Sequence, residues 1–229
     1  MKLRFATGIA LLATMNTFCA VVAVSVASAK LPENLNVGHV IKLTAPRLVG
    51  KMTLEEALAK RRSIREFTGR QLTLSELSQL LWACQGVTDK QRGLRSAPSA
   101  GALYPLEVYV VTKEGVFHYK PDRHELKVIR TGDIRKKLAG AALGQSAVSD
   151  APCVFVITAV FERTERKYGV RAERYVHMEA GHACQNLLLQ AVALGLSAVP
   201  IGAFDDSAVS RVLSLPKHHA PLYLIPLGR

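Results

Sequence analysis

The sequence predicts one layered domain of the α+β or α/β class, with a mixed sheet beside a long buried central helix. Residues 171–195 form the longest proline-free run with helical periodicity, and from Ala183 onward this run is nearly apolar on all sides. Such a pattern is typical of a helix that is buried on most of its surface. At 1.5 Å per residue it spans roughly 37 Å. Strand patterns interleave with helical ones elsewhere, which favours a layered domain.

An arm and two helices precede the first strand. Residues 30–50 contain prolines and glycines with little periodicity, so we expect a linker or extended arm. Two capping boxes follow, each a Thr with a Glu three residues later: Thr53 with Glu56, and Thr73 with Glu76. We expect the first helix to continue into Phe67 and the second to end at Gly86.

The rest of the chain supplies the sheet. We expect strands at 106–112, 115–119, 125–130, 152–161, 196–201 and 222–227, and short helices at 133–142 and 206–213. Residues 88–95 and the stretch from Pro98 to Pro105 are expected to be loops. Gly195 is the expected stop of the central helix.

The first 29 residues match a secretory signal peptide. Lys2 and Arg4 precede an uncharged apolar stretch, and Ala27-Ser28-Ala29 forms an A-x-A cleavage site before Lys30. We therefore expect export to the periplasm or the medium. The alternative is an uncleaved membrane anchor, because the apolar run is long.

The net charge indicates which classes of partner are possible, and the cysteine pattern indicates whether a disulfide forms. The formal net charge is +12, and +10 without Lys2 and Arg4, which suits nucleic acid, anionic lipid or a phosphorylated cofactor. Export argues against nucleic acid. Cys84, Cys153 and Cys184 lie in apolar patterns without a C-x-x-C motif, so buried free thiols are expected rather than a disulfide.

Three short stretches have side chains or backbone suited to a ligand. Arg61, Arg62, Ser63 and Arg65 offer forked donors and a hydroxyl for a phosphate, although a solvated charge run is the alternative. The small residues between Pro98 and Pro105 allow close approach of a flat ligand, or form a plain connection. Gly202 follows a buried strand, where free N–H groups would meet a ligand, or where the chain simply turns.

Other chemistries lack their motifs. His177 and His182 are five residues apart, which is not the spacing of a zinc-binding H-E-x-x-H helix, so no metal site is predicted. G-x-S-x-G, Walker and G-x-G-x-x-G patterns are absent from the sequence.

Five segments in unbroken order are similar to one known family. They are RRSIREF; LSELSQLLWACQGV with APSAGALYPLEVYVV; GVFHYKPDRHEL; KYGVRAERYVHMEAGHACQNLLLQAVALGLSAVPIGAFDD; and PLYLIPLG. They resemble the nitroreductase superfamily of FMN enzymes, and within it the SagB/thiazole-oxidase type of dehydrogenase domain. The resemblance covers the chain from about Lys42 to its end.

This resemblance implies an α+β domain over residues 51–229 that dimerises through its long helix and binds FMN between subunits. The positions that match the family's motifs would divide as follows: Arg61, Ser63 and Arg65 on the phosphate with Arg62 close by; Pro98, Ser99, Ala100 and Gly101 along the isoalloxazine; Gly202 and Ala203 with backbone N–H groups toward N5. Many relatives have basic residues after the last strand that reach the phosphate, and Arg229 would substitute for them.

One departure concerns catalysis. Azoline oxidases of the family share a Lys-Tyr pair on the central helix, whereas this chain has Arg174-Tyr175 there. Arginine does not deprotonate in proteins and is a poor base. Tyr175 is therefore the remaining catalytic candidate at this place, as an acid, or else it only closes the pocket.

The resulting hypothesis is an exported, homodimeric, FMN-dependent oxidoreductase. It would transfer hydride through flavin N5 between an unidentified donor, a nicotinamide or another reductant, and a small-molecule or peptide acceptor. Two alternatives stay open: a flavin-binding or flavin-scavenging protein without turnover, and a dehydrogenase of modified peptide heterocycles.

Overall fold

The computed structural model describes residues 29–32 and 34–229, so the predicted signal segment, residues 1–28, lies outside the described part. The helices are α1 (Leu54–Lys60), α2 (Leu74–Gln85), α3 (Arg135–Ala141), α4 (Ser146–Asp150), α5 (Glu162–Tyr168), α6 (Ala172–Ala193) and α7 (Asp206–Leu213), with 3-10 turns η2 (Ala100–Ala102), η3 (Pro121–Arg123) and η4 (Gly169–Arg171). The strands are β1 (Val40–Lys42), β2 (Val87–Asp89), β3 (Leu94–Arg95), β4 (Leu106–Thr112), β5 (Gly115–Lys120), β6 (Glu125–Thr131), β7 (Cys153–Ala159), β8 (Ser197–Ala198) and β9 (Ala220–Gly228).

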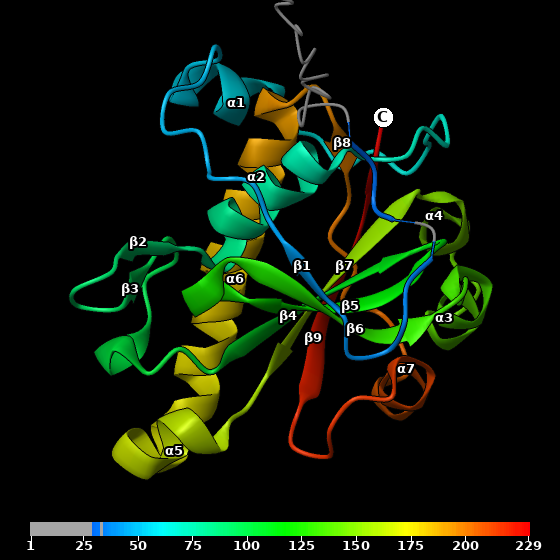
Figure 1. Cartoon of the computed structure of the whole chain (residues 1–229). Helices are drawn as coiled ribbons and strands as arrows, with labels where there is room; N and C mark the ends of the chain where they lie inside the picture. The colour runs from blue at the N-terminus through cyan, green and yellow to red at the C-terminus, as the bar shows by residue number, and fades with distance from the viewer. Residues whose placement is uncertain (1–28, 33) are drawn as a thin grey trace, which may run out of the picture.

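A seven-stranded sheet in the order β1-β6-β5-β4-β7-β9-β8 forms the middle of the molecule. Helices α1, α2 and α6 lie toward one of its faces, and α3, α4 and α7 toward the other (Figure 1). Successive residues of a strand point to opposite faces, so on β4 Val108 and Val110 join the core under α2 and α6, whereas Tyr109 and Val111 join the core under α3, α4 and α7. The predicted α+β class is confirmed. The named strands of this sheet all pair antiparallel, and the one parallel contact among the described residues is the bridge from Ser63 to Ala198.

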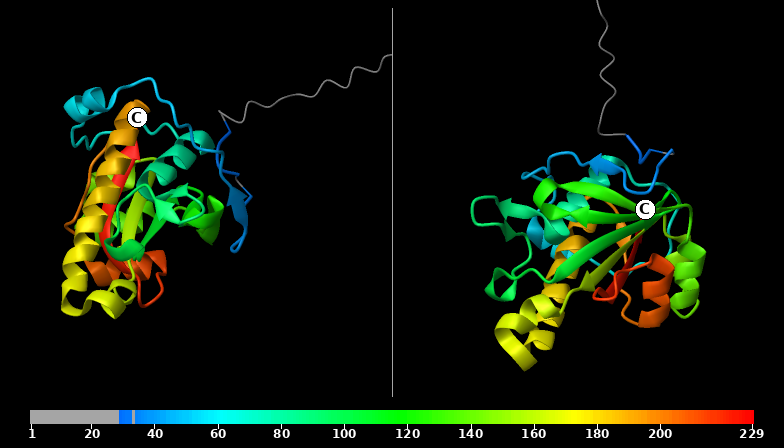
Figure 2. Two further views of the ribbon diagram at one scale, coloured as in Figure 1. Left: turned by 90° about the vertical axis from the view of Figure 1, so that its left-hand side faces the viewer. Right: turned by 60° about the horizontal axis from the view of Figure 1, so that its bottom comes forward.

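The predicted central helix is α6. It ends in a Schellman motif, in which Leu196 N–H donates to Ala191 O at 2.8 Å and Gly195 N–H to Val192 O at 2.9 Å, with Gly195 at φ +69°. α6 runs along most of the molecule, with α1 and the C terminus at one end and α5 at the other (Figure 2). Its buried side packs on α2 and the sheet, while Leu189 and Ala193 lie on a more exposed side.

The first helix is shorter than predicted. The Thr53–Glu56 capping box starts α1 as expected, but the helix ends at Lys60 and does not continue into Phe67. Arg61 leaves the helical region at φ −59° and ψ 122°, and the following chain pairs with β8: Ser63 bridges Ala198, and Ile64 N–H donates to Ala198 O at 3.1 Å. A backbone partner at the edge of the sheet therefore replaces the next helical turn.

The other differences are local. The arm docks on the domain, because β1 pairs antiparallel with β6 and the side chain of Leu31 is buried in the core. Residues 87–95 form a two-stranded hairpin rather than a loop, and α4 and α5 were not predicted. Cys84, Cys153 and Cys184 are buried free thiols, as expected. Among the described residues, no helix combines the length and apolar character needed to cross a membrane.

Candidate functional site

The Arg61–Arg65 segment lies beside the C-terminal end of α6. Because this segment leaves the helix and extends along β8, side chains two residues apart share one side of it. Arg61, Ser63 and Arg65 therefore fall on the same side, which a helix would not give. Neither arginine forms an ion pair within the part of the chain described here. Two free guanidinium groups and a hydroxyl suit a phosphate group.

Arg62 points elsewhere. Its guanidinium donates to Ala59 O at 3.0 Å and to its own neighbour Arg61 O at 2.7 Å, so it satisfies carbonyl groups at the end of α1. Arg229 lies at the same end of α6 as Arg61, because its guanidinium would be 3.9 Å from a Cβ built on Gly195, and Ser63 bridges Ala198 just beyond that glycine. Of the predicted phosphate residues, Arg61, Ser63, Arg65 and Arg229 are thus gathered at one end, and Arg62 is engaged in helix capping.

The Gly202–Ala203 turn follows the pairing of Ile201 with Leu224 of β9. Both residues are exposed, and neither N–H has a hydrogen-bond partner among the described residues. Gln145 donates its amide to Ala203 O at 2.9 Å and so fixes the plane of the turn. Two free N–H groups on a held backbone fit the role that the family resemblance gives them.

The loop from Pro98 to Pro105 has unusual backbone geometry. Gly101, Ala102 and Tyr104 have φ of +61°, +53° and +46°, a region that side chains disfavour. A Cβ on Gly101 would lie 2.9 Å from the Tyr168 hydroxyl, the end of a side chain that can shift, so it is mainly the positive φ that favours glycine there. Strained, tightly packed loops of this kind persist only where the surroundings hold them.

Tyr104 is the residue through which this loop is held. Its N–H donates to Ser99 Oγ at 2.9 Å, its carbonyl accepts from Arg163 at 3.0 Å, and its hydroxyl accepts from Arg95 N–H at 3.0 Å. The Arg95 guanidinium also lies over the Tyr104 ring, 4.7 Å from its centroid. Sequence reasoning did not single out Arg95 or Arg163, because neither belongs to a recognisable motif.

A buried carboxyl stands behind the same loop. Glu179 of α6 is 2% exposed, and its Oε1 has no hydrogen-bond partner among the described residues. Burial raises the pKa of Glu179 to about 7, although Ser99, Gln85 and the charge of Arg95 favour its ionised form. Glu179 therefore titrates near neutral pH, next to a residue of the predicted isoalloxazine lining.

Tyr175 lies at the loop end of α6. Its ring packs edge-on against Tyr168 with centroids 5.0 Å apart, and Tyr168 in turn approaches Gly101. The structure thus brings Tyr175 together with the Pro98–Gly101 loop. His177 and His182, also on α6, are exposed while Glu179 is buried, and in the described part of the chain no three His, Cys, Asp or Glu side chains are placed to hold a metal ion.

Within one chain the predicted site residues form two groups. Arg61, Ser63, Arg65 and Arg229 lie where α6 ends, whereas the loop at Gly101 packs against Lys167 and Tyr168, just before α6 begins. The 22 residues of α6 separate these places by roughly 33 Å. One chain therefore does not bring the phosphate group and the loop together.

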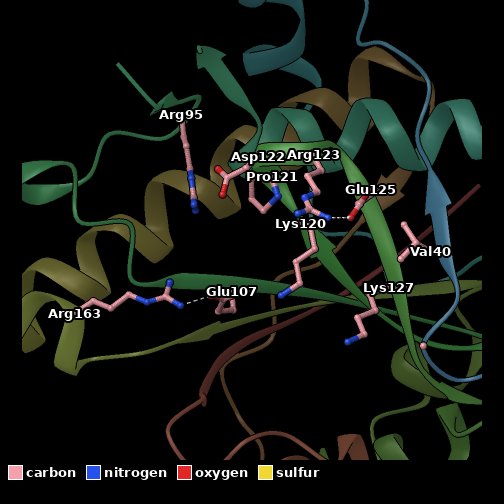
Figure 3. Close-up of a pocket in the computed structure, with 11 residues that line it drawn as sticks. Val40, Arg95, Glu107, Lys120, Pro121, Asp122, Arg123, Glu125, Lys127 and Arg163 are labelled. Carbon is pink, nitrogen blue, oxygen red and sulfur yellow. Dashed lines mark hydrogen bonds and ion pairs between the residues drawn. The ribbon is translucent and has the colours of Figure 1, made fainter. Parts of the chain in front are cut away.

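Two cavities accompany these groups. A groove of about 650 Å³ lies between the arm, α1, α2 and the more exposed side of α6, and apolar side chains border it: Leu48, Val49 and Leu54, with 79%, 85% and 61% exposure. A second pocket of about 610 Å³ lies on the sheet beside β4, β5 and β6, and basic side chains line it (Figure 3). Sequence reasoning predicted neither cavity.

A seven-stranded antiparallel sheet crossed by one long helix, with arginines at one end of that helix and a strained small-residue loop at the other, defines the protein as an α+β domain. The Nitroreductase family model matches residues 58–229, three quarters of the chain. The chain belongs to the nitroreductase family.

Individual relatives agree with this assignment. The protein named "Putative nitroreductase MJ1384" of Methanocaldococcus jannaschii is 46% identical over 187 residues, 79% of this chain and 93% of that protein. The crystal structure of a "putative nitroreductase" from Ralstonia eutropha matches with a TM-score of 0.76 at 32% identity. The match covers 89% of this chain and 96% of the other. The Escherichia coli microcin synthetase McbBCD complex, with truncated pro-MccB17 bound, contains a chain that matches with a TM-score of 0.64 at 25% identity, over 86% of this chain and 79% of that one.

Proposed function

We propose that this protein is an FMN-dependent oxidoreductase whose cofactor lies between two copies of the chain. The observation that carries the proposal is the separation of the phosphate-suited residues from the Pro98–Gly101 loop by the length of α6. In a two-fold dimer with antiparallel α6 helices, each end of one helix meets the opposite end of the other. Arg61 of one chain would then face Gly101 of its partner, twice per dimer.

The surface of the chain supports such a dimer. The groove beside α6 is bordered by exposed leucine and valine side chains of the arm and α1, including Leu48 and Leu54. Contiguous exposed apolar surface of this kind marks interaction sites. A second copy of the chain would cover this groove and complete the site in one step.

The chain's own residues would bind and orient the cofactor. Arg61, Ser63 and Arg65 would hold the phosphate through charge-assisted bonds, and Arg229 would add charge. Gly202 and Ala203 would direct their N–H groups toward N5 of the isoalloxazine ring. The Ser99–Gly101 backbone would lie along the same ring. When bound, the flavin supplies the hydride chemistry, and the protein supplies position and electrostatics.

The proposal also covers the hydride acceptor and the hydride donor. A peptide acceptor is supported by the similarity to a chain of the McbBCD complex, whose structure contains a peptide. Oxidation of a heterocycle with a lysine base is disfavoured, because Arg174 precedes Tyr175 on α6. A small-molecule acceptor and a nicotinamide or other reduced donor are the simpler expectation. Export through the predicted signal peptide would place the reaction outside the cytoplasm.

The proposal is tested by purifying the protein and recording its absorbance. We expect a yellow protein that contains one FMN per chain and is bleached by a reduced donor under anaerobic conditions. Tight FMN that no donor reduces at a useful rate would favour the scavenging protein instead. A colourless protein that also fails to bind added FMN would refute both.

A further inference from the structure

The basic pocket beside the sheet is a candidate binding site in its own right. It has a volume of about 610 Å³, within the range of small-molecule sites. Five basic residues from separate parts of the fold line it: Arg95, Lys120, Arg123, Lys127 and Arg163. Figure 3 shows the ends of Arg95, Lys120 and Arg163 turned toward one open space. None of these residues belongs to the set proposed to hold FMN.

The carboxylates in this pocket are mostly neutralised already. Glu107 accepts from His118 Nε2 at 2.5 Å and from Arg163, and together they lower its pKa to about 2 against the effect of burial. Glu125 is paired with Lys42 at 3.5 Å and with Arg123 at 3.9 Å. Glu107 and Glu125 are therefore already paired with cations and do not neutralise the other basic residues of the pocket.

Three cations have no such partner. Arg95, Lys120 and Lys127 form no ion pair with any carboxylate of the described residues, and Asp122 is the remaining acid of the pocket. The pocket thus has an excess of two positive charges. Like charges held around one concave space focus a positive potential there and attract anions.

We propose that this pocket binds a small molecule bearing a phosphate-type polyanion, between Lys120, Lys127 and Arg95. Ammonium groups act as point charges for phosphate oxygens, and the Arg95 guanidinium, which already donates from one nitrogen to Gln85 Oε1 at 3.2 Å, adds its remaining N–H donors. The volume leaves room for a larger molecule that carries the phosphate. The pocket is distinct from the phosphate site proposed near Arg61, because it lies on the β4-β5-β6 part of the sheet.

The pocket is connected to the loop of the candidate flavin site. Arg95 and Arg163 line the pocket, and both also hold Tyr104, Arg95 by its N–H and Arg163 by its guanidinium. An anion that offsets the repulsion among these cations would favour their present positions and so the loop geometry at Ser99. This part rests on the proposed function: anion and FMN should strengthen each other's binding, by about fivefold or more.

Inorganic pyrophosphate is the probe for binding, measured by calorimetry on FMN-saturated protein so that the Arg61 site is filled. We expect the double change Lys120→Gln with Lys127→Gln to raise the pyrophosphate Kd about tenfold or more. The matched control, Lys136→Gln with Lys137→Gln on exposed positions of α3, removes the same charge and should leave the Kd within about twofold. Equal weakening by both pairs, or no pyrophosphate binding to wild type, would overturn the proposal.

Further arms identify the ligand and separate this proposal from the flavin one. In protein without flavin, Arg61→Ala should remove any pyrophosphate binding at the empty phosphate site and keep binding at the pocket, whereas complete loss of pyrophosphate binding would place the anion near Arg61 and refute the pocket. ADP binding more tightly than pyrophosphate indicates a phosphate carried by a larger molecule; equal binding indicates the free anion. Citrate binding as tightly as pyrophosphate would contradict the assignment to phosphate. An FMN affinity that pyrophosphate does not change would refute the coupling alone.

Discussion

Ser63 and Ala198 form a parallel β-bridge, and this contact ends α1 and holds the arginine-rich segment at the edge of the sheet. The bridge joins a segment near the start of the domain to the strand that follows α6. It places Arg61 and Arg65 on one side of an extended chain, with Arg62 turned back onto the helix. The consequences of this arrangement for FMN binding are measurable.

Arg61→Ala should weaken FMN binding roughly 10- to 150-fold, because a charge-assisted contact contributes about 1.5–3 kcal/mol. Arg62→Ala is the matched control. It removes the same charge from the next residue, which caps α1, and we expect less than about a threefold effect on FMN. Ser63→Ala, which removes a neutral donor, should cost about 0.5–1.5 kcal/mol. Fluorescence titration gives each Kd.

Riboflavin separates a phosphate contact from general damage. It has no phosphate, so wild type and Arg61→Ala should bind it with nearly the same affinity. If Arg61→Ala lowers riboflavin and FMN affinity by one common factor, Arg61 does not hold the phosphate.

Glu179→Gln should change how stability depends on pH. The folded-state pKa of Glu179 is raised to about 7 from a model-compound value of 4.5, so the folded protein holds this proton more tightly than the unfolded chain. The contribution of Glu179 to the free energy of unfolding is therefore fully present below pH 4.5 and is lost as pH rises through 7. Across that window the loss is about 3 kcal/mol.

The comparison has to be made as a difference between variant and wild type. His219 has its pKa lowered to about 4 by burial, so its contribution to stability rises between about pH 4 and 6.5 and opposes that of Glu179. Chemical unfolding at pH 5 and pH 8 should show Glu179→Gln gaining stability relative to wild type as pH rises. A difference that is the same at both pH values would show that the pKa of Glu179 is not raised in the folded protein.

Assembly is the third prediction. We expect a homodimer that buries more than about 2,000 Å², as obligate interfaces do. Leu189→Lys places a charge in the groove beside α6 and should give monomers in sedimentation, together with loss of FMN. Val40→Lys, on the edge strand β1, is the control and should stay dimeric. A flavin-loaded wild-type monomer at micromolar concentration would contradict the dimeric site.

The N-terminus is the fourth prediction. Intact mass of the exported protein should correspond to a chain that begins at Lys30, because an A-x-A site precedes it. Recovery of the full-length chain from the membrane fraction would show an anchor instead.

Local signals were sufficient for much of the fold. The capping boxes at Thr53 and Thr73 start helices where predicted, because each is made from residues three apart. The stop at Gly195 is equally local, since it depends on glycine's tolerance of positive φ. The predicted end of α1 was wrong, because the helix is ended by the pairing of Ser63 with Ala198, a residue that is distant in sequence.

The candidate site also divides into features that the sequence indicates and features that appear only in the folded chain. Resemblance to the family identified Arg61, Ser99 and Gly202 as candidate residues, and these roles stay predictions. No local pattern indicates that Arg163 and Arg95 converge on Tyr104, because a loop, a strand and a helix supply the three residues. The separation of the two groups along α6 also follows only from the folded chain.

The burial of Leu31 has a consequence for the order of events during synthesis. Its side chain lies in a pocket with Pro152 and Cys153, which leave the ribosome roughly 120 residues later. At about 5–20 residues per second, that interval is on the order of ten seconds. If the predicted signal peptide is cleaved, the peptide bond before Lys30 would be open to the processing enzyme while the chain is still growing. In the complete fold the Ala29 carbonyl of that bond accepts a hydrogen bond from Leu74 N–H at 2.7 Å.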